Sequence, residues 1–185
     1  MEKPKLGLIV AATPRGEIGY QNSLPWRLKG DLQNFKTVTA GSVVIMGGNT
    51  YESLPVKPLA DRVNIVVSRR LVAKGDFNDI DKGLYAVSST VEALDLANRF
   101  ATDWVYFIGG AGIYEEAMRL VDRAHVTLVH KSGQYDTRIP NLKFPVSEWT
   151  LDSNHVTVFD TDPETGFPIP SHTYLVYNRL KLNHT

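Results

Sequence analysis

The sequence predicts an α/β fold: a single domain, residues 1–185, whose central mixed, mainly parallel sheet is flanked by helices and ends in an antiparallel C-terminal hairpin. Two observations predict it. Five short runs rich in Val, Ile or aromatic residues alternate with segments of helical spacing, and most of these runs are apolar throughout, as in strands covered on both faces. After Asp122 the helical patterns stop and strand-like runs follow. A length of 185 residues fits one domain.

The elements of the first two thirds can be assigned in chain order. The predicted parallel strands are Leu6–Ala12, Val43–Met46, Val63–Val67, Tyr85–Ser88 and Trp104–Ile108. The segments between them carry apolar residues three and four apart, which is the spacing of one helix face. These stripes are Leu32, Phe35 and Val38, then Val91, Leu94, Leu96 and Ala97, then Ile113, Ala117, Leu120 and Val121. Ser89 and Thr90 are suited to cap the second helix, because their hydroxyls can accept bonds from free amides.

The last third reads as three strands, Ala124–Lys131, Asn154–Asp160 and Thr173–Leu180. The last two are separated by residues 161–166, which are rich in turn-forming side chains. Sequential strands without a crossover helix can pair antiparallel, so we expect a hairpin at the edge of the sheet. The polar tail from Asn183 onward has no reason to be ordered.

Composition excludes several classes of function. Twenty basic residues balance twenty acidic ones, whereas proteins that bind nucleic acid usually have an excess of basic residues. Nucleic-acid binding is therefore the least favoured class of function. The chain has no cysteine, which excludes disulfides and thiolate chemistry. The run Leu6–Ala12 is too short to span a bilayer. The five histidines show no ligand spacing. We therefore expect a soluble, cytoplasmic protein, a monomer, with no metal and with neither nucleic acid nor membrane as partner.

Three predicted strands end in residues suited to phosphate. Ile108 is followed by Gly109, Gly110, Ala111 and Gly112, Met46 by Gly47 and Gly48, and Val67 by Ser68, Arg69 and Arg70. Ligands of open α/β sheets bind at this edge, where glycines allow close approach and helix-start amides attract anions. The dinucleotide fingerprint fails, because Glu115 stands at its third glycine. A tight turn without ligand stays an alternative for the first segment, and solvated arginines for the third.

A long loop and an isolated acid follow the first strand. Gly19, Asn22 and Pro25 mark the loop, and such loops often serve as lids. Asp31 lies four and seven residues before Phe35 and Val38, which places its carboxyl on an apolar stripe. Burial there would raise its pKa. Asp31 could then handle a proton or bind an amidine-like cation, although a helix-start residue with no further role is the alternative.

Taken together, these motifs resemble dihydrofolate reductase, from about Leu6 to Tyr177. Leu24-Pro25-Trp26, Asp31-Leu32 and Phe35-Lys36 are similar to that family's substrate-side signature. Ile45-Met46-Gly47 with Thr50, and Ile108-Gly109-Gly110 with Tyr114, are similar to its cofactor-side signatures. The resemblance implies reduction of 7,8-dihydrofolate to tetrahydrofolate with NADPH as cofactor, and hence an oxidoreductase of one-carbon metabolism and a target of antifolates.

The resemblance also implies roles for individual residues. Asp31 would bind the pterin edge and promote protonation of the ring, and Leu24 and Trp26 would belong to a loop that closes beside the nicotinamide. The other substrate-binding residues would be Val10, Ala11, Leu32, Phe35, Leu54, Arg62, Ile108 and Thr127; among them Arg62 would pair with the tail carboxylate, and Thr127 would hold Asp31 through a hydrogen bond.

The implied cofactor site is larger. It comprises Ala12, Ile18, Gly19, Gly47, Gly48, Asn49, Thr50, Ser68, Arg69, Arg70, Ile108, Gly109, Gly110, Ala111, Gly112, Ile113 and Tyr114. In this family the bond Gly109–Gly110 would be cis. Gly48 and Asn49 stand where basic side chains are common, so Arg69 and Arg70 would compensate at the 2′-phosphate.

Two alternatives remain from sequence. A riboflavin-pathway NADPH reductase has a related fold and a similar glycine-rich strand end, but it lacks the Leu-Pro-Trp and Asp pairing found here. A non-catalytic folate- or nucleotide-binding protein is favoured by Gly48 and Asn49.

Overall fold

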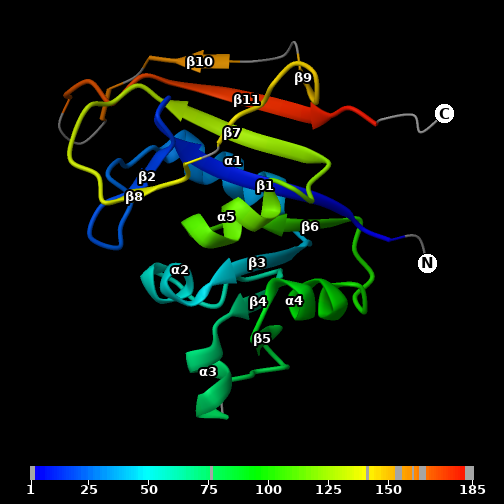
Figure 1. Ribbon diagram of the computed structural model, residues 1–185. Coiled ribbons are helices and arrows are strands. Elements are labelled where there is room, and N and C mark those ends of the chain that lie inside the picture. The colour runs from blue at the N-terminus through cyan, green and yellow to red at the C-terminus, as the bar shows by residue number, and fades with distance from the viewer. Residues whose placement is uncertain are drawn as a thin grey trace.

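A nine-stranded sheet forms the centre of the molecule (Figure 1). The computed structural model describes residues 3–75, 77–140, 142–152, 156–159, 161–162 and 166–181. The strand order is β10-β11-β7-β1-β6-β3-β4-β5, and β9 also pairs with β11. The strands are β1 (Lys5–Ala12), β3 (Val43–Gly47), β4 (Val63–Val67), β5 (Leu84–Val87), β6 (Trp104–Phe107), β7 (Arg123–Val129), β9 (Trp149–Leu151), β10 (Val156–Val158) and β11 (His172–Arg179).

The predicted mixture of parallel and antiparallel pairing is confirmed. Strands β7, β1, β6, β3, β4 and β5 pair parallel with their neighbours, whereas β11 pairs antiparallel with β7, β9 and β10. The C-terminal hairpin is present, with Thr157 opposite Thr173. Residues 163–165 of the predicted turn, residues 154, 155 and 160 of the predicted strand and the tail from residue 182 lie outside the described residues.

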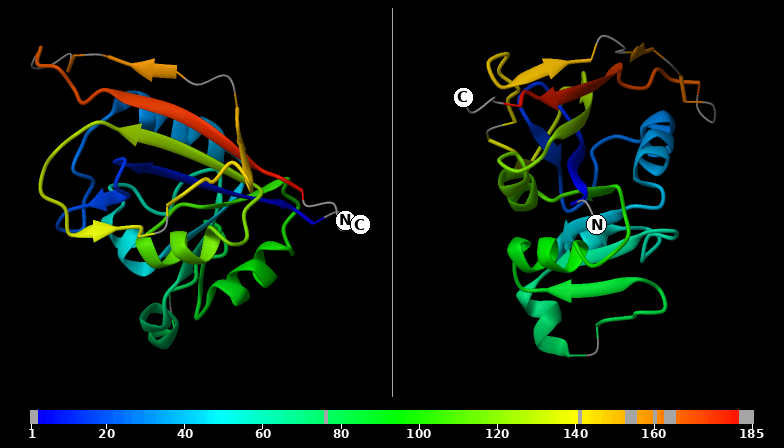
Figure 2. Two further views of the ribbon diagram at one scale, coloured as in Figure 1. Left: turned by 45° about the horizontal axis from the view of Figure 1, so that its top comes forward. Right: turned by 90° about the vertical axis from the view of Figure 1, so that its right-hand side faces the viewer.

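Helices cover both faces of the sheet. They are α1 (Lys29–Thr39), α2 (Gly48–Ser53), α3 (Arg69–Lys74), α4 (Thr90–Ala97) and α5 (Ala111–Ala117). Side chains of α4 and α5 pack into one buried cluster with Leu8, Val10 and Phe107. Side chains of α1, α2 and α3 pack against a second cluster around Ile9, Met46 and Ile108. Figure 2 shows this separation, with α1 on one side of the sheet and α4 and α5 on the other.

Three apolar residues assigned to helix stripes are exposed instead. Val91 is 69%, Leu32 48% and Leu120 44% exposed. In α4 the Ser89 side chain accepts a bond from the Glu92 amide, and the helix that begins there turns Thr90, Ala93 and Ala97 inward. In α1 only Thr39 is fully buried, so the inner face of this helix is covered only in part.

Three short elements, α3, β2 (Glu17–Gly19) and β8 (Thr137–Arg138), were not predicted from the sequence. Helix α3 begins at Arg69, where the Ser68 side chain accepts a bond from the Leu71 amide. Strands β2 and β8 form a separate two-stranded sheet. Their pairing ties the loop after β1 to the segment after β7, because the Asp136 amide donates to the Gly19 carbonyl and the Ile139 amide to Gly16.

Candidate active site

Asp31 lies in the first turn of α1 and faces the sheet. Its carboxyl accepts a 2.5 Å hydrogen bond from the Thr127 hydroxyl of β7. Burial raises the pKa of Asp31 above its ordinary value near 3.8, while the Thr127 bond and the charge of His172 act in the opposite direction. Phe35 and Val38 share its face of the helix and are partly buried. The predicted placement of this acid on an apolar stripe is therefore confirmed.

Sheet topology brings Thr127 to Asp31 across 96 residues of sequence. Strands β1 and β7 run parallel, with Ala11 directly beside Thr127. Because side chains alternate along a strand, Ile9 and Ala11 face α1, whereas Val10 and Ala12 point into the cluster on the other face. A ligand on the α1 face of the sheet would therefore meet Val10 and Ala12 through backbone atoms, and the ligand-binding roles of both residues stay predictions.

The loop after β1 holds the tryptophan of the predicted signature next to β7. Trp26 is 7% exposed, packs near Val129 and Tyr135, and its Nε1 is buried with no hydrogen-bond partner among the described residues. The Lys131 side chain donates to the Pro25 carbonyl at 2.6 Å. Leu24, in contrast, is 54% exposed. Ile18 is buried, and Gly19 stands in β2.

The remaining substrate-side residues surround the second apolar cluster. Phe35 and Leu54 are partly buried against it, and Ile108 is buried within it. Arg62 donates from Nε to the Thr39 carbonyl at 3.2 Å, and its guanidinium lies 5.8 Å from the centre of the Phe35 ring. A cavity of about 440 Å³, lined in part by Leu59 and Arg62, adjoins this guanidinium.

Glycines from two strand ends meet at the carboxyl edge of the sheet. The Gly47 amide donates to the Gly109 carbonyl at 2.7 Å, and the predicted cis bond between Gly109 and Gly110 is confirmed. Gly109 has φ +114, and an added Cβ would lie 3.0 Å from the Tyr114 ring. An added Cβ at Gly110 would lie 3.3 Å from the Thr50 hydroxyl. Side chains at Gly109 and Gly110 would crowd Tyr114 and Thr50, so glycine suits both positions.

The helices that start at this edge leave their first amides uncapped by side chains. α2 begins after Gly47 and α5 after Gly110, and neither N-cap makes a side-chain hydrogen bond. Free first-turn amides attract negative charge. In these helices Asn49 and Gly112 are exposed, Thr50 and Ala111 are partly buried, and Ile113 and Tyr114 are buried. The Tyr114 hydroxyl donates to the Ile9 carbonyl at 2.8 Å.

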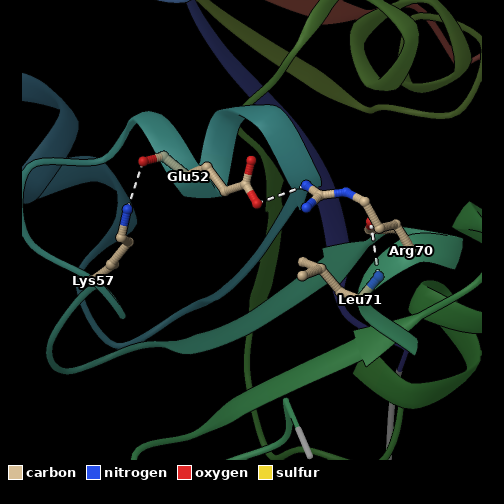
Figure 3. A network of polar contacts seen from close by, with 5 residues as sticks. Glu52, Lys57, Arg70 and Leu71 are labelled. Carbon is tan, nitrogen blue, oxygen red and sulfur yellow. Dashed lines mark hydrogen bonds and ion pairs between the residues drawn. The ribbon is translucent and has the colours of Figure 1, made fainter. Parts of the chain in front are cut away.

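The two adjacent arginines diverge at the start of α3. Arg70 donates to the Glu52 carboxylate of α2 at 2.6 Å, and this contact holds the pKa of Glu52 below its usual range (Figure 3). Lys57 reaches the Glu52 carbonyl from the other side. Gly48 packs on Ser68, whose Oγ would lie 2.9 Å from an added Cβ. Arg69 is exposed and makes no ion pair among the described residues.

Within the described ranges, no three His, Asp or Glu side chains are grouped to hold a metal ion. No helix found there is long and apolar enough to cross a membrane.

Known proteins resemble the chain over most of its length. Residues 5–176 match the family model described as dihydrofolate reductase. A dihydrofolate reductase type 8 from Escherichia coli is 35% identical over 180 residues, which cover 96% of this chain and 98% of that protein. The chain belongs to the dihydrofolate reductase family. A bifunctional dihydrofolate reductase-thymidylate synthase from Paramecium tetraurelia is 40% identical over 114 residues, but these cover 60% of this chain and only 22% of that protein.

A solved structure supports the same family assignment. The dihydrofolate reductase from Enterococcus faecalis complexed with NADP(H) and RAB-propyl superposes with a TM-score of 0.77 at 26% identity, covering 97% of this chain and 98% of that one. The predicted fold and the predicted enzyme class, an NADPH-dependent oxidoreductase that reduces dihydrofolate, are confirmed. The riboflavin-pathway and non-catalytic alternatives are not favoured.

The Thr127 bond gives a prediction about Asp31. Thr127→Val removes a donor that stabilises the carboxylate, so the pKa of Asp31 should rise further. If a protonated Asp31 is needed, the fall in turnover at high pH should move to higher pH. Turnover should also drop roughly 2- to 10-fold, because the acid is positioned less tightly. This factor corresponds to the free energy of about one hydrogen bond. Thr127→Ser keeps the hydroxyl and should restore the wild-type pH profile; a Val variant with that profile would contradict the role.

Proposed function

We propose that Asp31 binds the amino and amide edge of the pterin and promotes protonation of the ring nitrogen beside the carbon that accepts hydride. The observation that supports this role is its environment: a partly buried carboxyl on an apolar helix face, bonded to Thr127 and raised in pKa by burial. An acid with a raised pKa keeps its proton to higher pH than an exposed carboxyl does, and its negative form stabilises a cation that develops beside it.

The chemistry that NADPH supplies when bound is hydride transfer to the pterin ring. The glycine-lined edge fits a pyrophosphate, because α2 and α5 start there directly after Gly47 and Gly110, and neither N-cap makes a side-chain hydrogen bond. We assign the phosphates to this edge, with Thr50, Ala111, Gly112 and Ile113 beside them, and the nicotinamide to the face near Ala12, Ile18 and Gly19. Trp26 and Leu24 would exclude water from the reacting rings.

Phe35, Leu54 and Ile108 would pack on the bound rings, because all three are apolar and belong to the cluster under α1. Holding two rings face to face supplies the orientation part of the rate enhancement. Leu32, half exposed on the outer side of the helix, would contribute at the rim of the site.

Arg62 would hold the carboxylate of the glutamate tail. Its guanidinium is fixed by the Thr39 carbonyl and the Phe35 ring, and its unused N–H donors can pair bidentately with a carboxylate. Arg62→Gln should raise KM for dihydrofolate roughly 10-fold or more, since a hydrogen bond between charged groups is worth about 1.5–3 kcal/mol, and leave turnover at saturation near wild type.

The matched measurement uses a dihydropterin that lacks the glutamate. For this substrate Arg62→Gln and wild type should show equal KM values. Equal loss of affinity for both substrates would mean that Arg62 supports α1 and does not read the tail. Absence of turnover with dihydrofolate and NADPH in the wild-type protein would overturn the proposed mechanism as a whole.

The arginine pair predicts how cofactors are distinguished. Arg69 is exposed without an ion pair, whereas Arg70 is already bonded to Glu52. Arg69→Gln should therefore lower kcat/KM for NADPH roughly 10-fold, while kcat/KM for NADH, which lacks the 2′-phosphate, stays constant. Arg70→Gln is the matched control and should change the NADPH/NADH ratio less. A larger effect at Arg70 would reverse the assignment.

We propose further that the protein is a single-domain monomer and acts in the cytoplasm on small molecules alone. The balanced charge offers no footprint for nucleic acid. Light scattering of the purified protein tests the monomer, and fractionation of the source cells tests the location.

A further inference from the structure

Strand β11 carries two polar side chains that neither the sequence motifs nor the proposed mechanism uses. His172 is 1% exposed, and Tyr174 stands two residues further along the same face. Tyr174 lies directly opposite Thr127 in the antiparallel pair of β11 and β7. Since directly opposed side chains lie side by side on one face of a sheet, Tyr174 is the neighbour of the residue that bonds Asp31.

Tyr174 also contacts the start of α1. A Cβ added to Gly30 would lie 2.7 Å from the Tyr174 hydroxyl oxygen and 3.9 Å from its Cζ. A side chain at residue 30 would have to displace this hydroxyl, so glycine permits the close approach. Gly30 immediately precedes Asp31, so the hydroxyl of Tyr174 lies against the first turn of α1 beside this acid.

The direction in which this hydroxyl points follows from the contacts of His172. Its Nδ1 lies 3.1 Å from the Pro170 carbonyl and its Nε2 lies 3.2 Å from the Tyr174 hydroxyl. A carbonyl only accepts, so in the neutral ring Nδ1 carries the hydrogen and Nε2 accepts. With this neutral ring the Tyr174 O–H is donated to His172, and the lone pairs of its oxygen are left for the side of α1; a charged His172 would instead donate from Nε2 to the Tyr174 oxygen.

We propose that Tyr174, locked by a neutral His172, is a positioning residue for Asp31: it packs on the first turn of α1 beside this acid and offers an acceptor oxygen without a hydrogen to donate. Such an oxygen suits a helix start, whose N-cap Leu28 supplies no side-chain acceptor. Beside a carboxylate, in contrast, an acceptor oxygen is unfavourable, so it favours the protonated acid that the proposed reaction uses. The proposal rests in this respect on the proposed function.

Other polar groups lie around Asp31 and do not replace Tyr174. From β7 comes Thr127, which stabilises the carboxylate. From α5 comes Tyr114, whose hydroxyl is occupied by the Ile9 carbonyl. Tyr174 also lines a cavity of about 300 Å³, whose charged and titratable lining residues are Arg27, Lys29, Asp162, His172 and Tyr174.

The decisive variant is Tyr174→Phe, which keeps the ring and removes only the oxygen. In the ligand-free protein, the Asp31 carboxyl followed by ¹³C NMR should titrate at lower pH than in wild type. In the assay, the fall in turnover with rising pH should begin correspondingly earlier. Turnover on the high-pH side should drop roughly 2- to 10-fold, the worth of one polar contact, with KM for NADPH unchanged.

Tyr177→Phe on the same strand is the matched control. Its ring stacks on Phe144 at 4.1 Å on the other face of the sheet, and it should leave the Asp31 titration at its wild-type pH. A Tyr174→Phe protein with an unshifted titration, or one shifted to higher pH as expected if the hydroxyl donated to Asp31, overturns the proposal. The NMR titration needs no turnover, so failure of the proposed reaction would be recognised separately.

A second test uses Gly30. Gly30→Ala should lower the melting temperature of wild type, because the new methyl group meets the Tyr174 oxygen. The same change should be tolerated in the Tyr174→Phe protein, where the nearest remaining atom is Cζ at 3.9 Å. Such a non-additive pair demonstrates direct contact. Equal losses in both backgrounds would show that Tyr174 does not set the position of α1.

Discussion

Asp31→Asn should reduce turnover of dihydrofolate at neutral pH by roughly 10²–10⁴-fold, the usual worth of a positioned acid or base, while leaving NADPH affinity unchanged. Asparagine keeps the shape of the side chain, and its carbonyl oxygen can still accept the Thr127 bond. It cannot hold a transferable proton or stabilise a developing cation. Steady-state assays with dihydrofolate and fluorescence titration with NADPH measure the two effects.

The same substitution should stabilise the fold above acidic pH. Because the folded pKa of Asp31 is raised, the unfolded chain loses this proton first. The contribution of Asp31 to stability is therefore complete below about 3.8 and is lost as pH rises through the folded pKa. Asparagine does not titrate, so the melting temperature of the variant should exceed that of wild type at pH 8 and converge with it at pH 4.

Asp95→Asn, the same change on the exposed face of α4, is the control and should alter neither activity nor the pH dependence of melting. An Asp31→Asn protein that is less stable than wild type at pH 8 would show that the carboxylate is held by attractive contacts that outweigh its burial. An active variant would remove Asp31 from the chemistry.

The parallel strands were predictable because each is a continuous apolar run between polar segments. β1, β3, β4 and β6 appear within about one residue of their predicted bounds. The faces of the helices were less predictable, since a stripe three and four apart does not say which of its members turns inward. Val91 and Leu120 are exposed for this reason, whereas the small residue Ala93, absent from the predicted stripe, is buried.

The residues of the candidate site also differ in how far the sequence could predict them. Asp31 carries a local signal, its spacing from Phe35 and Val38. No local pattern in the sequence predicts its hydrogen bond to Thr127, because the two residues meet only through the order and register of β1, β7 and α1. This pair was expected only from the family resemblance. Tyr174 and His172 were missed because their position beside Asp31 depends on the register of β11 on β7, which alternation alone does not fix.

His125 should dominate the loss of stability at moderately acidic pH. Its side chain stands on β7 two residues before Thr127, packs edge-on against Tyr106, and its Nε2 is buried with no hydrogen-bond partner among the described residues. Burial, together with the charge of Arg123, lowers the pKa of His125 from about 6.5 to about 4. The folded state therefore favours the neutral form of the His125 ring.

The sign of the effect follows from linkage. Above pH 6.5 neither the folded nor the unfolded state binds a proton at His125. The protonation of His125 then makes no difference to the free energy of unfolding. As pH falls from 6.5 towards 4 the unfolded chain takes up the proton and the folded protein does not, and the free energy of unfolding declines. At about 1.4 kcal/mol per pH unit, the total loss approaches about 3 kcal/mol at pH 4, a large share of the stability of a typical domain.

His125→Phe keeps an aromatic ring against Tyr106 and removes both the titration and the unpaired nitrogen. Urea unfolding of the variant should give a flatter decline between pH 6.5 and 4, with an advantage over wild type that grows to about 2 kcal/mol at pH 5. His130→Phe, the same change at an exposed position just after β7, should keep the wild-type slope. If the two variants decline in parallel, a different group carries the acid sensitivity, and the buried Nε2 of His125 has a partner that offsets its burial.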